Sequence, residues 1–226
     1  MWSYYGTKKR IAKHYPIPKH SKIIEPFCGA AQYSLYGNNW KNEIILNDKY
    51  NVIYSIWDYL INSATDKDIL SLPDMEQGDY VDDFNISTVE KYLIGFCINS
   101  GSAQPKKKTA KYNSWNKTKI DIAKNLYKIK HWVVMSKDYN EMKNDKATWF
   151  IDPPYQYGGE WYHSSVKNKH IDYNELSKWC KSRNGQIIVC ENSKSDWLPF
   201  RELVDMNGIL HKTKEVIWTN NDMVLF

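Results

Sequence analysis

Asp152, Pro153, Pro154 and Tyr155 are the residues of this chain best suited to chemistry, and they directly follow the apolar run 148–151. Proline fixes its own φ, lacks an N–H and keeps the preceding residue out of the helical region, so we expect Asp152 to be extended at a strand end. Its carboxylate and the Pro153 carbonyl can accept both hydrogens of an exocyclic amine such as adenine N6, while Tyr155 stacks on the base. Such a group would act by positioning the substrate and by preorganised electrostatic stabilisation. The alternative is that the two prolines form only a rigid turn after the strand.

A second candidate group is a glycine loop near the amino terminus. Residues 22–27 are typical of a short buried strand, and Gly29 follows it where a backbone could pass close to a ligand. Asp48 lies nineteen residues after Gly29, at the end of the apolar run 44–47. Nucleotide-binding βαβ units place an acidic residue at about this distance to hold ribose hydroxyls, so the spacing favours a cofactor bound through its ribose. A simple strand-to-helix turn at Gly29 and a helix cap at Asp48 are the alternatives.

Together these segments resemble the Dam-type adenine-N6 DNA methyltransferases, whose catalytic signature is Asp/Asn-Pro-Pro-Tyr/Phe. The corresponding cofactor loop in that family is Glu-Pro-Phe-x-Gly-x-Gly, and this chain has Glu25, Pro26, Phe27 and Gly29 but Ala31 at the second glycine. The order of the segments along the chain is also that of the family. The resemblance implies that these loop residues bind S-adenosyl-L-methionine and that the substrate is an adenine flipped out of double-stranded DNA.

The same resemblance implies further cofactor contacts. Residues 3–9 are similar to the family's opening segment, which contacts the methionine end of the cofactor, and Tyr5, Gly6 and Lys8 are the matching positions. Lys8 is then expected to pair with the methionyl carboxylate, and Asp138, after the strand-like run at 131–135, to lie against the cofactor adenine. A solvated basic tail and a charged surface turn are the corresponding alternatives.

The positive charge is concentrated in the middle of the chain. Residues 105–130 contain nine lysines and one acid, whereas the whole chain carries a net charge of only +5. A localised basic tract with interspersed aromatic and amide side chains is typical of a nucleic-acid contact, although most lysine runs are only solvated faces. Within this tract, Thr118 and Asp121 have the spacing of a capping box for a helix. The expected contacts are Lys106, Lys107, Lys108, Lys111, Tyr112, Asn113, Trp115, Lys117 and Lys119.

Length and composition are consistent with one large α/β core. The chain has 226 residues, of which 42% are hydrophobic. We expect an α/β fold with a Rossmann-like methyltransferase sheet, mostly parallel with an antiparallel carboxyl-terminal edge. The catalytic domain would comprise residues 1–61 and 131–226, with residues 62–130 inserted as a target-recognition subdomain. In the insert, Ile120, Ala123, Leu126 and Tyr127 are expected to form the buried face of a helix, and the last strands are expected at 209–213, 215–219 and 223–226.

Several classes of protein are disfavoured. The four cysteines form no Cys-x-x-Cys pair and are expected to be reduced and structural, and the six histidines show no metal-binding spacing, so no metal is expected. No apolar run is long enough to span a membrane and no signal peptide begins the chain, so we expect a cytoplasmic protein with no membrane association. A monomer or weak dimer is expected.

The leading hypothesis is therefore methyl transfer from S-adenosyl-L-methionine to N6 of a flipped adenine in DNA, with residues 156–163 closing over the base. The same fold acting on RNA adenine or on cytosine N4 is the nearest alternative. A non-catalytic nucleic-acid-binding module built on a methyltransferase scaffold is an alternative of another class.

Overall fold

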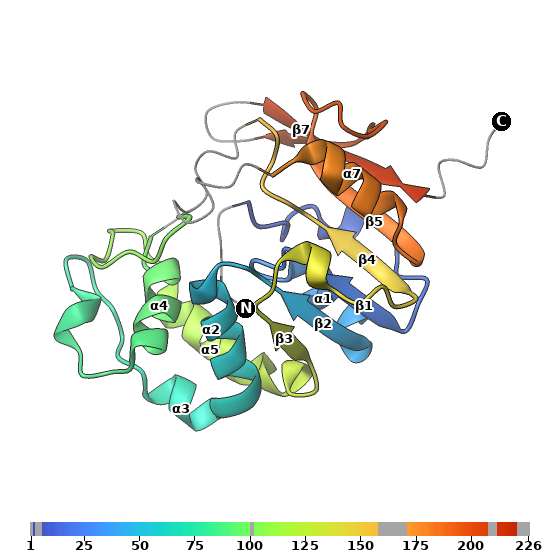
Figure 1. Cartoon of the computed structure of the whole chain (residues 1–226). Helices are drawn as coiled ribbons and strands as arrows, with labels where there is room; N and C mark the ends of the chain where they lie inside the picture. The colour runs from blue at the N-terminus through green and yellow to red at the C-terminus, as the bar shows by residue number, and fades with distance from the viewer. Residues whose placement is uncertain (1, 3–5, 100–101, 158–170, 208–211, 221–226) are drawn as a thin grey trace.

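The computed structural model describes residues 2, 6–99, 102–157, 171–207 and 212–220. Within these ranges seven strands form one sheet in the order β3-β2-β1-β4-β5-β7-β6 (Figure 1). Neighbours from β3 to β5 are parallel, whereas β7 is antiparallel to both β5 and β6. The predicted mostly parallel, Rossmann-like sheet with an antiparallel carboxyl-terminal edge is thus confirmed. The strands are β1 (Lys22–Glu25), β2 (Glu43–Asn47), β3 (Val133–Met135), β4 (Ala147–Ile151), β5 (Gly185–Asn192), β6 (Arg201–Asn207) and β7 (Lys212–Thr219).

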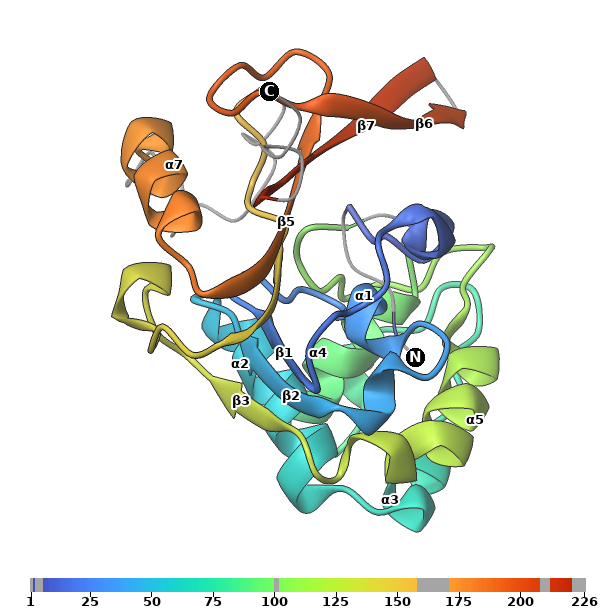
Figure 2. The same ribbon diagram turned by 90° about the vertical axis from the view of Figure 1, so that its right-hand side faces the viewer.

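Helices cover both faces of this sheet. Helices α2, α4 and α5 lie on one face and α7 lies on the other, as the two views show (Figures 1 and 2). The helices are α1 (Gln32–Leu35), α2 (Asn51–Asp58), α3 (Asp66–Ser71), α4 (Thr88–Cys97), α5 (Trp115–Asn125) and α7 (Tyr173–Lys181). A π-helical turn (Tyr59–Ser63) extends α2, and short 3-10 turns occur at Ala12–His14, Asn39–Lys41, Val81–Asp83, Leu126–Ile129 and Tyr139–Glu141. None of the described helices is both long and apolar enough to cross a membrane.

The strands are apolar on both sides because both faces of the sheet are covered. Alternate residues enter two separate cores: Ile23 and Phe150 pack toward α2 and α4, whereas Ile24 and Trp149 pack toward α7. All five residues of β4 are buried. A strand with this pattern belongs in the middle of a sheet. The residues that follow its carboxyl end therefore lie between the two helical layers that cover the sheet.

The segment expected to be an inserted subdomain shares its core with the sheet. Within that segment, Phe96 of α4 and Trp115 of α5 belong to the same hydrophobic cluster as Ile23 and Leu46 of the central strands. The four cysteines are buried thiols, which confirms the expectation of reduced, structural cysteines. The helical layer and the sheet are therefore joined by continuous apolar packing.

The predicted start of α5 is wrong, and its predicted buried face is only partly right. The helix begins at Trp115, so Thr118 lies inside it, and the capping boxes of this layer are at Thr65–Asp68 and Ser87–Glu90 instead. Ala123 and Leu126 are buried as predicted, whereas Ile120 and Tyr127 are exposed. The buried positions of α5 and its 3-10 extension follow the spacing i, i+4, i+7, i+8, i+11 and i+14 from Trp115. They are Trp115, Lys119, Ile122, Ala123, Leu126 and Ile129.

At the carboxyl edge the strand expected at 215–219 is confirmed as part of β7. The strand β6 was not predicted, because its sequence mixes charged side chains with only a few apolar residues. The expected strand at 209–213 falls partly outside the described residues, and the one at 223–226 falls entirely outside them. Asp172 was correctly predicted to cap α7, since its carboxylate accepts from the backbone N–H groups of Asn174 and Glu175.

A buried amide joins three segments at the carboxyl ends of the parallel strands. Asn47, the last residue of β2, donates to the carbonyls of Pro26 (3.0 Å) and Lys137 (3.1 Å). Its side-chain oxygen accepts from the backbone N–H of Lys137 at 2.9 Å. Asn47 is fully engaged in this way and buried. It therefore fixes the loops that follow β1 and β3 relative to each other.

We expect Asn47→Ala to lower the free energy of unfolding by about 2 kcal/mol, because three backbone groups lose their buried partner. Urea-induced unfolding followed by circular dichroism measures this change. Asn62→Ala is the matched control, since Asn62 is exposed and bonds only to Asp58 within its own helical turn. Equal stability of the two variants would contradict the proposed role of Asn47.

Candidate active site

The predicted cofactor loop and the Asp-Pro-Pro-Tyr segment follow two neighbouring strands. Strand β1 pairs with β2 on one side and with β4 on the other, so the strand order reverses between β1 and β4. Open α/β sheets bind ligands outside the carboxyl ends of the strands at such a switch point. Gly29 follows β1 and Asp152 follows β4, so both segments flank this position.

Asp152 contacts a buried cation through one of its two carboxylate oxygens. Its Oδ1 lies 3.0 Å from the Nζ of Lys8. Among the described residues no donor is bonded to Oδ2 of Asp152 or to the carbonyl of Pro153. The next carbonyl, that of Pro154, accepts from the hydroxyl of Tyr173 at 2.8 Å. Two neighbouring acceptors, one charged and one neutral, are thus left without a donor among these residues.

The segment after Asp152 is held in place by contacts with distant strands. The backbone N–H of Gln156 donates to the carboxylate of Glu191 at 2.6 Å, and Glu191 is a buried residue of β5. The hydroxyl of Tyr155 donates to both carboxylate oxygens of Glu215, at 3.1 and 3.0 Å. Glu191 and Glu215 were not predicted as site residues. Their signal in the sequence is that each is an acid next to an apolar strand run.

Lys8 is the centre of the charge arrangement. Its ammonium contacts Asp152, lies 3.3 Å from Oε1 of Glu215 and donates to the hydroxyl of Tyr155. It also lies 4.6 Å from the centroid of the Tyr155 ring. An ammonium has three N–H groups, so these three acceptors use all of them. The structure thus gives Lys8 partners within the Asp-Pro-Pro-Tyr site, and its pairing with the methionyl carboxylate stays a prediction.

The carboxylate of Asp152 titrates in an unusual range. Burial raises the pKa of Asp152 to about 7, and the charge of Lys8 opposes that rise. For Lys8 the balance is different: burial lowers the pKa, but the charge of Asp152 and that of Glu215 outweigh it, and the pKa lies well above its usual value. Lys8 is therefore a permanent cation of the site, whereas Asp152 changes charge near neutral pH.

A thiol completes the cluster. The ligating atoms of Asp152, Cys190 and Glu215 all lie within 4.8 Å of one another, and groups of this kind also bind metal ions. Here the ammonium of Lys8 contacts both carboxylates and supplies the positive charge between them. Burial raises the pKa of Cys190 well above its ordinary value, so the sulfur is held as a neutral thiol.

Two residues of the glycine loop have a left-handed backbone. Gly29 has φ 45° and Ala31 has φ 46°, and Ala31 is the only non-glycine residue among those described with a positive φ. Left-handed conformations favour glycine because they bring Cβ close to the backbone in other residues. Ala31 is therefore strained at a position that would suit glycine.

Asp48 closes the glycine loop. Its Oδ2 accepts from the backbone N–H of Gly29 at 3.0 Å and its Oδ1 from that of Tyr50 at 2.9 Å. Burial raises the pKa of Asp48 to about 6, so the group is ionised at neutral pH. Trp57 of α2 donates to the carbonyl of Gly29 at 2.7 Å. Each carboxylate oxygen keeps a further lone pair, which is the capacity needed for ribose hydroxyls.

Glu25 and Phe27 differ in what they offer a ligand. Glu25 is buried, and its Oε1 accepts from the backbone N–H of Ser34 at 2.9 Å in the first turn of α1. Burial raises the pKa of Glu25 to about 8. Its side chain thus supports the loop from behind, and Pro26 is buried beside it. The half-buried ring of Phe27 lies 5.5 Å from that of Tyr139 and offers an aromatic surface.

The remaining predicted cofactor contacts have different positions. Asp138 forms an ion pair with Lys49 and caps the 3-10 turn at Tyr139–Glu141. Gly6 has φ 74° and precedes Lys8, so it turns the chain into the site. Tyr5 lies outside the described residues, as do residues 158–163 of the expected closing loop.

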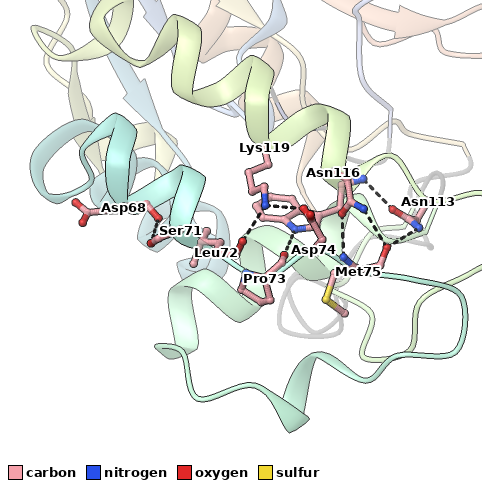
Figure 3. Close-up of polar contacts among 10 residues, drawn as sticks. Asp68, Ser71, Leu72, Pro73, Asp74, Met75, Asn113, Asn116 and Lys119 are labelled. Carbon is pink, nitrogen blue, oxygen red and sulfur yellow. Dashed lines mark hydrogen bonds and ion pairs between the residues drawn. The ribbon is translucent and has the colours of Figure 1, made fainter.

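Three of the predicted nucleic-acid contacts are directed into the protein. Figure 3 shows two of them, Asn113 and Lys119, with their polar contacts. Trp115 is 0% exposed and its indole N–H donates to the carbonyl of Pro73 at 2.8 Å. Lys119 is 7% exposed and its ammonium binds the Leu72 carbonyl (2.9 Å) and Asp74 (2.6 Å). The prediction that these two side chains bind nucleic acid is corrected, because the phase of α5 places both beneath the surface.

The third inward-directed residue is Asn113, whose amide donates to the carbonyl of Met75 and accepts from the backbone N–H of Trp115. The other predicted contacts are exposed. Tyr112 is 80% exposed with the ammonium of Lys111 5.4 Å from its ring centroid. The exposed lysines among the predictions are Lys106, Lys107, Lys108, Lys111 and Lys117.

Comparison with known proteins gives weak similarities only. No family model matches the sequence, and no curated protein matches it. Among solved structures, a candidate methyltransferase from Pseudomonas syringae has a TM-score of 0.38 at 9% identity, covering 91% of each chain. A candidate methylase from Haemophilus influenzae has a TM-score of 0.36 at 8% identity, covering 87% of this chain and 85% of that one. A conserved hypothetical protein from Streptococcus pyogenes has a TM-score of 0.35 at 8% identity, covering 87% and 84%.

We expect Ala31→Gly to change the free energy of unfolding by less than about 1 kcal/mol, because relief of left-handed strain is offset by loss of a buried methyl group. Ala31→Val should instead lower it by about 2 kcal/mol or more, since a branched side chain tolerates this conformation poorly. Thermal unfolding of both variants gives the comparison. A well-tolerated valine would show that the loop does not require a left-handed residue here.

The burial of α5 predicts opposite outcomes for two aromatic residues of the basic tract. Trp115→Ala should lower the free energy of unfolding by about 3 to 5 kcal/mol, as for other buried aromatic residues. Tyr112→Ala should change it by less than about 0.5 kcal/mol, as is usual at exposed positions. Urea denaturation distinguishes the two, and comparable losses of stability would contradict the assignment of Trp115 to the core and Tyr112 to the surface.

Proposed function

We propose that this protein is a methyltransferase that uses S-adenosyl-L-methionine to methylate N6 of an adenine flipped out of double-stranded DNA. One observation carries the proposal. Oδ2 of Asp152 and the carbonyl of Pro153 have no donor among the described residues, next to Tyr155 and at the switch point of the sheet. Two acceptors and a ring in this arrangement are complementary to an amine on a flat base.

The acceptors act on the geometry of the target nitrogen. An exocyclic adenine amine is a poor nucleophile because its lone pair is delocalised into the ring. When Asp152 and Pro153 accept its two hydrogens, the nitrogen is drawn toward tetrahedral geometry and its lone pair is directed away from them. Tyr155 holds the plane of the base by stacking, and its own position is fixed by Glu215.

The residues of the glycine loop fit the proposed cofactor. Asp48 offers lone pairs for ribose hydroxyls, Gly29 permits a close backbone approach, and the ring of Phe27 offers a surface for stacking. When bound there, S-adenosyl-L-methionine supplies an electrophilic methyl group. Asp152, as an anion, stabilises the positive charge that develops on the target nitrogen and accepts its hydrogen bond until a proton is released.

The exposed lysines support the choice of a nucleic acid as substrate. Lys106, Lys108, Lys111 and Lys117 are exposed on the helical layer, and Lys107 pairs with Asp82 at 2.7 Å on the surface. The aromatic rings of Tyr80 and Tyr112 lie beside Lys108 and Lys111. Binding through such groups should weaken steeply as salt increases, because it depends on phosphate contacts.

Methyl-labelled S-adenosyl-L-methionine tests the proposal directly. The protein is incubated with double-stranded DNA, single-stranded DNA and RNA oligonucleotides, and the nucleosides are separated after digestion. We expect label in N6-methyladenine from double-stranded DNA. Label in RNA or in N4-methylcytosine would replace the proposed substrate with one of these alternatives. Calorimetry that detects no cofactor binding to the folded protein would instead favour a non-catalytic nucleic-acid-binding module.

The pKa of Asp152 predicts the pH dependence of methyl transfer. Its ionised form is the acceptor, and burial raises its pKa to about 7, so activity should be lost as pH falls through that value. We expect kcat/KM for the nucleic acid to fall about tenfold per pH unit below this point. Asp152→Asn keeps an acceptor oxygen but cannot titrate, so its lower activity should lack this acid limb.

Asp152→Ala removes the acceptor altogether and should abolish transfer while cofactor affinity, measured by calorimetry, is largely kept. Unchanged turnover in this variant would exclude the assigned role of Asp152. An acid limb that persists in Asp152→Asn would assign the titration to another group.

A further inference from the structure

We propose that Glu215 is a positioning residue that neutralises Lys8, so that the negative charge of Asp152 remains available to the target nitrogen. This inference rests on the proposed function. Glu215 is a buried residue of β7, and its Oε1 lies 3.3 Å from the Nζ of Lys8, which is itself 3.0 Å from Asp152. The three charges form one buried group assembled from the amino-terminal segment, the end of β4 and β7.

The net charge of this group decides what it can stabilise. Lys8 and Asp152 alone would cancel, and a neutral pair gives little stabilisation to a developing cation. With Glu215 the group carries one net negative charge. During transfer the nitrogen–carbon bond forms as the carbon–sulfur bond breaks, and positive charge moves onto the target nitrogen. A pre-oriented negative group in a site shielded from water stabilises that charge strongly.

Three donors surround the carboxylate of Glu215: the Tyr15 hydroxyl at 2.7 Å, the Tyr155 hydroxyl and the ammonium of Lys8. A carboxylate acts only as an acceptor, so these contacts use it in the role that the inference requires. The same contacts fix the Tyr155 ring, which stacks on the base in the proposed mechanism. Glu215 thus acts on the target site through Lys8 and Tyr155.

The surroundings of Asp152 give a readout that a purely structural role would not change. Burial is the main cause of its raised pKa; the charge of Glu215 adds to the rise and that of Lys8 opposes it. Removal of the Glu215 charge should therefore lower the pKa of Asp152 and move the acid limb of activity to lower pH. The titratable and charged groups around Asp152 are Lys8, Tyr15, Glu25, Tyr155, Cys190, Glu191 and Glu215.

The test is Glu215→Gln, which keeps the shape and one acceptor oxygen but removes the charge. We expect kcat to fall by on the order of 10- to 100-fold, as for loss of one electrostatic contribution or of correct placement at an active site. The KM for the nucleic acid and the calorimetric Kd for S-adenosyl-L-methionine should remain within about threefold, because neither ligand contacts Glu215 in the proposed mechanism. The acid limb should move to lower pH.

Glu202→Gln is the matched control, because Glu202 is an exposed carboxylate of the neighbouring strand β6 that pairs with Lys214 at 2.6 Å. The same change of charge there should leave kcat and the pH profile unaltered. Thermal unfolding of each variant verifies that the fold is kept.

A double variant separates electrostatics from packing. In Lys8→Met with Glu215→Gln both compensating charges are absent, and Asp152 again carries the net negative charge of the site. Apolar replacement of a buried ion pair is often tolerated. We expect kcat of the double variant to be at least about tenfold higher than kcat of Glu215→Gln, because the net charge of the site is again negative.

Two results would overturn the inference: a Glu215→Gln variant with kcat within twofold of the unmodified protein, or a double variant no more active than Glu215→Gln. Should Glu215→Gln fail to fold, the double variant decides alone, since its kcat must then lie within about tenfold of the unmodified protein. If the unmodified protein transfers no label to any oligonucleotide, the proposed function fails instead, which is a distinct outcome.

Discussion

A buried ammonium shared by two buried carboxylates is the interaction on which this site depends. Asp152 and Glu215 come from strands that meet at one end of the sheet, and without a cation between them they would repel each other in a medium that screens charge poorly. Lys8 supplies that cation from a segment more than 140 residues away in sequence. The pairing requires the amino-terminal segment to lie beside the carboxyl end of β4 and the amino-terminal half of β7, so one contact both stabilises the charges and joins these three segments.

The parallel sheet provides the second constraint. Its order reverses between β1 and β4, which brings the glycine loop next to the Asp-Pro-Pro-Tyr segment although about 120 residues separate them. Buried polar side chains then fix the loops: Asn47 joins the segments after β1 and β3, Glu25 supports the first turn of α1, and Glu191 holds the backbone at Gln156. Each satisfies backbone groups that a loop cannot pair by itself. These hydrogen bonds hold the loops at the carboxyl ends of the parallel strands, although the loops are not regular secondary structure.

The lysines of the basic tract have two different roles in the helical layer: some bind backbone carbonyls of the protein, and others lie on the surface. Lys119 and Lys130 use their ammonium groups on backbone carbonyls at the ends of neighbouring helical segments, while the lysines at 106–108, 111 and 117 remain exposed. Net charge alone does not distinguish these roles. The distinction follows from helix phase, because a lysine on the inner side of α5 must find acceptors within the protein. The exposed subset is correspondingly smaller than the composition of the tract indicates.

The sequence by itself determined the local parts of this protein. The prolines after Ile151 placed Asp152 at a strand end, the spacing from Gly29 to Asp48 predicted a βαβ unit, and apolar runs located every strand of the sheet's parallel part. These features depend on neighbours along the chain. Only the tertiary structure decided which distant residues contact each other. It pairs Lys8 with Asp152, brings Glu215 and Tyr15 to the same site, and buries Trp115 in the core. Such contacts join residues up to 207 positions apart, and the buried face of α5 depends on which elements pack against it, so the local pattern does not determine them.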